Sequence, residues 1–158
     1  MSKFDVECFV DNLEIFLKDK LNPQIALIDA EKNSGWTTSP VNEKAYVFQS
    51  LDNLPVNFDP ILFYGIAQIP STGIGPATAK TLIIEISVIV ADSNSKTIGK
   101  KLLRYQRALE EIFEENFYKI NNVRPKIEVS SLQPISFKLQ NSSNQFKAIG
   151  VEIELSIF

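Results

Sequence analysis

The sequence predicts an α+β fold in a single domain, with a mostly antiparallel β-sheet and two main α-helices packed on one face. Three observations predict it: an amphipathic helix opens the chain, a very apolar strand leads into a second two-faced helix, and alternating strands close it. The chain has 158 residues, 44% of them hydrophobic, which suits one domain with one core. We therefore expect residues 1–158 to form one unit.

The first helix is predicted from about Phe4 to Leu21, because apolar residues recur there at steps of three and four. Ser2 with Asp5 resembles a capping box at its start. Asn22-Pro23 predicts its end, since proline lacks the backbone N–H that the next turn needs. The apolar stripe consists of Val6, Phe9, Val10, Leu13, Phe16 and Leu17.

Extended segments with long loops are expected next. Ile25, Leu27 and Ile28 suggest a short strand, and the polar stretch from Asn33 to Pro40 predicts a loop. Two further strands and a second loop, rich in Gly, Pro, Ser and Thr, are then predicted. Their bounds are Tyr46–Leu51 and Ile61–Ile69 for the strands and Pro70–Lys80 for the loop.

Thr81–Ala91 is the clearest strand, because its even-numbered residues are all apolar and its odd-numbered side is half polar. This pattern favours a central strand with a helix on one side. A helix follows from about Lys96 to Tyr118. Its predicted buried stripe is Ile98, Leu102, Tyr105, Leu109, Ile112 and Phe113, with Phe117 near the end. Strands are predicted last at Lys126–Val129, Ile135–Leu139 and Gln145–Phe158, the last two forming a hairpin.

Composition argues against several functions. The chain has no histidine and one cysteine, Cys8, so a zinc site is excluded and a cysteine nucleophile would lack a histidine base. We interpret Cys8 as a small core or boundary residue. Gly73–Thr78 lacks the residues of a phosphate-binding loop and precedes a strand. We predict no catalytic, cofactor-binding or metal-binding residues, and Glu152 and Glu154 are interpreted as a polar strand face.

Charge and hydropathy point to a protein made and folded in a cytoplasm. The net charge of −3 argues against a strongly basic nucleic-acid binder. The N-terminus lacks the pattern of a signal peptide, and no apolar run has the roughly 20 residues needed to span a membrane. We therefore expect no membrane partner.

The second helix carries its charges in an unusual order, with cations in its first half and anions in its second, opposite to what the helix dipole favours. Arg107 with Glu110 and Glu111 would form local pairs. Three interpretations remain open: a solvated face, contacts between the two halves on neighbouring copies, or a basic contact to DNA. Trp36 either folds back over the core or anchors a partner chain. The candidate subunit-interface residues are Trp36, Lys100, Lys101, Arg104, Arg107, Glu111, Glu114 and Glu115.

The order of segments resembles the tail terminator, or tail completion, proteins of tailed bacteriophages. The resemblance covers most of the chain and rests on the helix Phe4–Leu21, the apolar strand Leu82–Ser93, the charged helix from Lys96 and the closing segment Val151–Phe158. It implies a structural virion protein, not an enzyme. No single functional residue carries over.

The resemblance implies a homohexameric ring that caps the tail tube, stops its polymerisation and joins it to the neck or head-completion protein. DNA would pass through the lumen without sequence-specific binding. The protein would be assembled in the host cytoplasm, function in the virion tail or neck and need no cofactor. The terminal strand could be an edge that pairs with a neighbouring copy. The alternatives are a phage neck or head-completion (head–tail joining) protein, a small enzyme, or an unrelated small binding domain.

Overall fold

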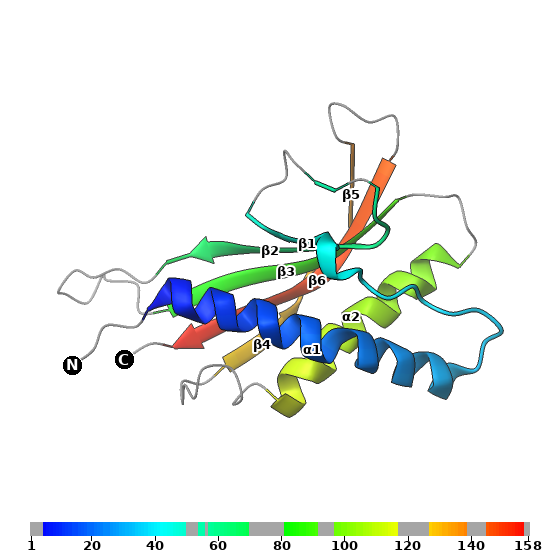
Figure 1. Ribbon diagram of the computed structural model, residues 1–158, viewed down its shortest axis with the longest axis horizontal. Coiled ribbons are helices and arrows are strands. Elements are labelled where there is room, and N and C mark those ends of the chain that lie inside the picture. Colours follow the sequence, from blue (N-terminus) through cyan, green and yellow to red (C-terminus); the bar gives the residue numbers. More distant parts are fainter. Residues whose placement is uncertain are drawn as a thin grey trace.

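The computed structural model describes residues 5–49, 54–55, 57–69, 81–91, 97–116, 127–138 and 145–156 (Figure 1). Two helices and a short 3₁₀ turn accompany one mixed β-sheet. In chain order the elements are α1 (Val6–Lys32), η1 (Glu43–Ala45), β1 (Tyr46–Phe48), β2 (Ile61–Gln68), β3 (Thr81–Ala91), α2 (Ile98–Asn116), β4 (Ile127–Ser131), β5 (Ile135–Lys138) and β6 (Gln145–Ser156). The predicted loop 70–80 and the second-helix ends at Lys96 and Tyr118, with Phe117, lie outside the described residues.

The sheet has six strands in the order β1-β2-β3-β6-β4, with β5 also paired to β6. Among the described strands only β1 and β2 run parallel; every other pair is antiparallel. This arrangement confirms the predicted α+β class. The expectation that the terminal strand is an edge is wrong, because β3 pairs along one side of β6 while β4 and β5 pair along the other.

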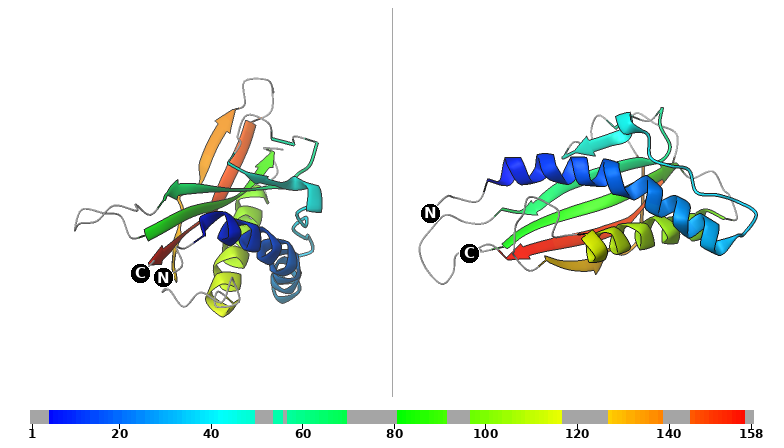
Figure 2. Two further views of the ribbon diagram at one scale, coloured as in Figure 1. Left: turned by 60° about the vertical axis from the view of Figure 1, so that its left-hand side comes forward. Right: turned by 60° about the horizontal axis from the view of Figure 1, so that its bottom comes forward.

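Both helices cover one face of the sheet, as predicted (Figure 2). The predicted alternation of β3 is the reason, since its fully apolar side forms the floor on which the helices pack. The neighbouring strand β6 adds a second row to this floor. The buried floor residues are Leu82, Ile84, Ile86, Val88 and Val90 from β3, with Ile149, Val151, Ile153 and Leu155 from β6.

Helix α1 continues for 11 residues beyond Leu21 and contains Pro23, so both the predicted end at Asn22-Pro23 and the predicted strand at residues 25–28 are wrong. Ile25 and Ile28 lie four and seven positions after Leu21, so they extend the same apolar stripe and are buried. Their burial offsets the missing backbone bond at Pro23. The helix bends part-way along (Figure 2, right).

The start of α1 is capped by Asp5, whose carboxylate accepts a hydrogen bond from the Cys8 backbone N–H at 3.0 Å. Ser2, the other half of the predicted capping box, lies outside the described residues. The Cys8 side chain is exposed, so its interpretation as a core or boundary residue is wrong. Cys8 directly precedes the buried stripe residue Phe9.

Helix α2 buries the predicted stripe, with Leu102, Tyr105, Leu109, Ile112 and Phe113 almost inaccessible to solvent and Ile98 packed beside them. Phe113 meets Phe16 of α1 with ring centroids 5.4 Å apart. The aromatic contact joins the two helices. The core therefore lies between the helix pair and the floor of the sheet.

Strands β4 and β5 follow one another along the same side of β6. The stretch from Leu132 to Pro134 faces only Ile149 and Gly150, so one residue bulges out of the edge. The Gly150 carbonyl accepts hydrogen bonds from the Leu132 N–H at 2.9 Å and from Gln106 Nε2 of α2 at 3.3 Å. A Cβ on Gly150 would lie 1.9 Å from the Ile86 carbonyl oxygen, so the close approach of β3 requires glycine here.

Candidate functional site

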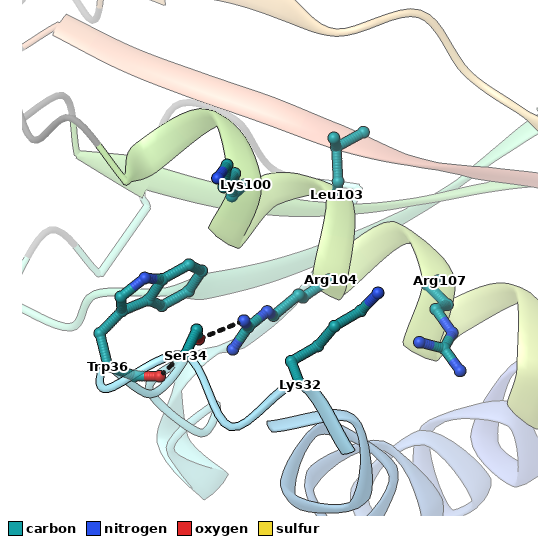
Figure 3. Close-up of a pocket in the computed structure, with 7 residues that line it drawn as sticks. All are labelled: Lys32, Ser34, Trp36, Lys100, Leu103, Arg104 and Arg107. Carbon is teal, nitrogen blue, oxygen red and sulfur yellow. Dashed lines mark hydrogen bonds between the residues drawn. The ribbon is translucent and has the colours of Figure 1, made fainter. Parts of the chain in front are cut away.

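Four of the predicted interface residues line one pocket between the end of α1, the loop that follows it and the first half of α2 (Figure 3). Its volume is about 410 Å³. Cationic side chains and one indole dominate its walls. The lining residues are Lys32, Ser34, Trp36, Lys100, Leu103, Arg104 and Arg107.

Arg104 forms the inner wall of this pocket and is only 7% exposed. Its Nη1 donates to Asp29 Oδ1 at 2.7 Å, and its Nη2 donates to Ser34 Oγ at 2.5 Å. The guanidinium lies against the Trp36 ring, 3.8 Å from its centroid. A planar, multi-donor guanidinium can make all three contacts at once, which a lysine could not. Arg104 therefore ties α1, the following loop and α2 together.

Asp29 is the other half of this connection. Its carboxylate also accepts hydrogen bonds from the Thr38 backbone N–H at 2.9 Å and from Thr38 Oγ1 at 2.6 Å. Burial raises the pKa of the Asp29 carboxyl, but the Thr38 and Arg104 hydrogen bonds and the Arg104 charge outweigh it, so the pKa lies below its ordinary value. The loop from Asn33 to Thr38 is thus fixed at both ends, since Asn33 ends α1 in a left-handed conformation.

Arg107 makes a second, more exposed connection between the helices. Its Nη2 lies 2.7 Å from Glu31 Oε2, and its Nε lies 2.6 Å from Glu111 Oε1. Glu111 also accepts a hydrogen bond from Gln24 of α1 at 2.5 Å. The hydrogen bond from Arg107, together with its charge, lowers the pKa of the Glu31 carboxyl. The predicted pairing of Arg107 with Glu111 is confirmed.

The remaining predicted residues lie near the pocket or farther along α2. Lys101 Nζ lies 6.0 Å from the centroid of the Trp36 ring. Glu114 is exposed, and the side chain of Glu115 lies outside the described part of the chain. Glu110, predicted to pair with Arg107, instead accepts a hydrogen bond from the Ser131 hydroxyl of β4. Trp36 folds back onto α2.

Sequence reasoning missed Lys32, Ser34, Leu103 and Asp29. Asp29 and Lys32 lie between the predicted strand and the predicted loop, beyond the predicted end of the first helix, so no signal in the sequence placed them on a helical face. Leu103 lies outside the apolar stripe of α2 and is 59% exposed. The spacing of the apolar residues in α2 could have identified it. Ser34 becomes part of the pocket only through the folded loop.

A second surface lies on the sheet face that no described helix covers. Glu85 of β3 stands directly opposite Glu152 of β6, and Glu154 of β6 stands directly opposite Glu128 of β4. Side chains at directly paired positions project from the same face. These four residues form what we call the acidic face. Glu152 and Glu154 therefore belong to the polar strand face that the sequence predicted.

The chemistry available at these surfaces is charge recognition. The pocket offers ammonium groups beside an indole and a leucine, a combination that suits a carboxylate or phosphate flanked by apolar groups. Among the described side chains, no three metal-ligating residues gather where they could hold a metal ion. Burial raises the pKa of the Tyr46 hydroxyl to about 12, so this group is not ionised at neutral pH.

Comparison with known proteins gives no family assignment: no protein-family model matches the chain, and no curated protein matches it in sequence. Neither described helix is long and apolar enough to cross a membrane.

Proposed function

We propose that this chain is a tail terminator of a tailed bacteriophage. It is a structural virion protein that forms a hexameric ring, caps the tail tube, stops tube polymerisation and joins the tube to the neck or head. It is assembled in the host cytoplasm and performs no catalysis. The elements on which the resemblance rests, α1, β3, α2 and β6, all contribute to one core between the helices and the sheet, which supports the proposal.

The observation that carries the proposal furthest is the presence of two unlike charged surfaces on one small subunit. The pocket on the helix layer bears cations, and the sheet face opposite the helices bears four glutamates. Closing a ring by one repeated contact requires two different, complementary surfaces on each subunit. A cationic pocket and an acidic face on one subunit would meet this requirement, which supports the proposal.

DNA passes through the lumen of the ring without sequence reading. The net charge of −3 favours weak contact with a phosphate backbone, which suits a passage rather than a binding site. The cations Arg104 and Arg107 are already paired with carboxylates of α1, which leaves less positive charge for phosphates.

The test is a binding comparison with tail tubes and with portal–capsid complexes of the phage that encodes the chain. Purified protein is mixed with each, and bound protein is measured after sedimentation. We expect binding to the ends of tubes. Binding to portal–capsid complexes alone would assign the chain to head completion instead, and binding to neither would reject both assignments.

A further inference from the structure

We propose that the pocket beside Trp36 receives carboxylates from the acidic face of a neighbouring copy of this chain. This inference rests on the proposed ring and names the contact that would close it. It differs from one of the three interpretations that the sequence left open, in which the acidic half of α2 meets the basic half of the next α2.

The acidic half of α2 is a poor counterpart because part of it is used within the chain. Glu111 pairs with Arg107 and accepts from Gln24, and Glu110 accepts from Ser131. One contact within α2, one to α1 and one to β4 therefore hold these carboxylates in place. A neighbour would have to break them before it could use them.

Two of the cations that line the pocket form no ion pair with described residues. Arg104 and Arg107 are balanced by Asp29, Glu31 and Glu111. Lys32 and Lys100, which line the same pocket, have no ion pair with any described residue. These two ammonium groups are the ones available to an incoming anion.

The walls of the pocket are already ordered. Arg104 holds Ser34 and stacks on Trp36, so the rim does not need to be fixed when a partner binds. Leu103 projects from α2 at 59% exposure, between this pocket and a second hollow lined partly by Lys100 and Ile135. The partner surface should therefore combine carboxylates with an apolar contact.

The acidic face has that composition. Glu85, Glu152 and Glu154 form no ion pair with described residues, and Glu85 directly opposes Glu152. Like charges at directly opposed positions destabilise a sheet. A cation from outside the subunit would remove this cost. Half-buried Ile83, directly opposite Glu154, supplies the apolar contact.

The placement of the two surfaces suits a head-to-tail contact. The two helices lie on one side of the sheet (Figure 2). The pocket lies beside these helices, and the acidic face lies on the side of the sheet that they do not cover. One copy's helix layer would then cover the next copy's open sheet face. A contact between two different surfaces repeats around a ring.

Charge reversal tests the contact. One variant carries Lys32→Glu with Lys100→Glu, a second carries Glu85→Lys with Glu152→Lys, and a third carries all four changes. Self-association is measured by sedimentation, free in solution and on tail tubes. Each double variant should associate about tenfold more weakly than the natural chain, and the quadruple variant should recover. Mixing the two double variants should also restore association, because each supplies the surface that the other needs.

Lys44→Glu with Lys138→Glu is the matched control, since both lysines are exposed and lie away from the pocket. It makes the same change in net charge as Lys32→Glu with Lys100→Glu and should associate as the natural chain does. Thermal unfolding of each variant checks that it folds, and recovery in the quadruple variant gives a second check.

The outcomes separate this inference from the proposed function. If both double variants associate and cap tubes as the natural chain does, the contact is wrong and the ring stands. If the natural chain stays monomeric in solution and on tubes, both are wrong. If Lys32→Glu with Lys100→Glu keeps its self-association and loses only its affinity for DNA, the pocket is a nucleic-acid site and the contact is rejected.

Discussion

Arg104 and Asp29 lie 75 positions apart in the sequence, yet they form a salt bridge of 2.7 Å with side chains that are only 8% and 10% exposed. The bridge joins the last turns of α1 to the middle of α2. Thr38 and Ser34 complete the hydrogen bonding of the two partners, so the same pair also fixes the loop that carries Trp36. The shape of the pocket depends on it.

Removing one partner of this bridge should be strongly destabilising. Asp29→Asn leaves the Arg104 guanidinium buried without its counter-charge, and we expect a loss of about 3 kcal/mol in the free energy of unfolding. Urea denaturation measures it. Lys20→Ala is the control, because Lys20 pairs with Asp19 at the surface, where removal should cost about 0.5 kcal/mol or less. Equal losses in the two variants would contradict this account of the bridge.

The same carboxyl should give the stability a characteristic pH dependence. The pKa of Asp29 lies below its ordinary value of 3.8, since its hydrogen bonds and the Arg104 charge outweigh its burial. Its stabilisation is therefore complete above the unfolded-state pKa and is lost as the pH falls through the folded-state pKa. Between about pH 4 and about pH 2 the natural chain should lose more stability than Asp29→Asn. Parallel curves from urea denaturation at each pH would refute the assignment.

Loss of the hydroxyl should have opposite effects on stability in two tyrosines. The Tyr46 hydroxyl has no hydrogen-bond partner among the described residues, whereas the Tyr105 hydroxyl donates to the Ser39 carbonyl at 2.7 Å. Tyr46→Phe should be neutral or stabilise by up to about 1 kcal/mol, and Tyr105→Phe should destabilise by about 1 kcal/mol. Thermal unfolding of both variants decides, and a clear destabilisation by Tyr46→Phe would show that its hydroxyl is satisfied in solution.

Replacement by alanine should also have opposite effects on stability at two glycines. Gly150→Ala places a methyl group 1.9 Å from the Ile86 carbonyl oxygen, and both groups belong to paired strands that cannot separate cheaply. We expect a loss of about 3 kcal/mol. Gly99→Ala meets nothing within 4 Å in the first turn of α2 and should stabilise by about 0.5 kcal/mol. Chemical denaturation compares the two, and tolerance of Gly150→Ala would mean that β3 and β6 lie farther apart.

The sequence predicted the sheet more accurately than the first helix. The bounds of β3 were predicted to the residue because one fully apolar side allows only one register against the helices. In α1 two signals conflicted. A proline inside a helix costs about 3 kcal/mol, whereas burying Ile25 and Ile28 contributes about 1.5–3 kcal/mol each, so burial prevails. Asn22, which suggested a helix end, instead binds the Val41 backbone N–H and C=O at 2.8 and 2.9 Å.

The sequence could predict the charged residues of the candidate site only where they lie on α2. The charges of α2 stand in the sequence, so Lys100, Arg104 and Arg107 could be selected. Their partners Asp29 and Glu31 could not, because the segment that carries them was not expected to be helical. A charge pattern read along one helix cannot show which of its charges the neighbouring helix neutralises. The cations that remain available, Lys32 and Lys100, are identified only from the packed helices.

The most direct test of the central claim is the length of tail tubes grown with this chain present. Tube subunits are polymerised with increasing amounts of the purified protein, and lengths and ends are measured by electron microscopy. We predict that growth stops and that each stopped end carries a ring of copies of this chain. Tubes that grow to their usual length with bare ends would contradict the account.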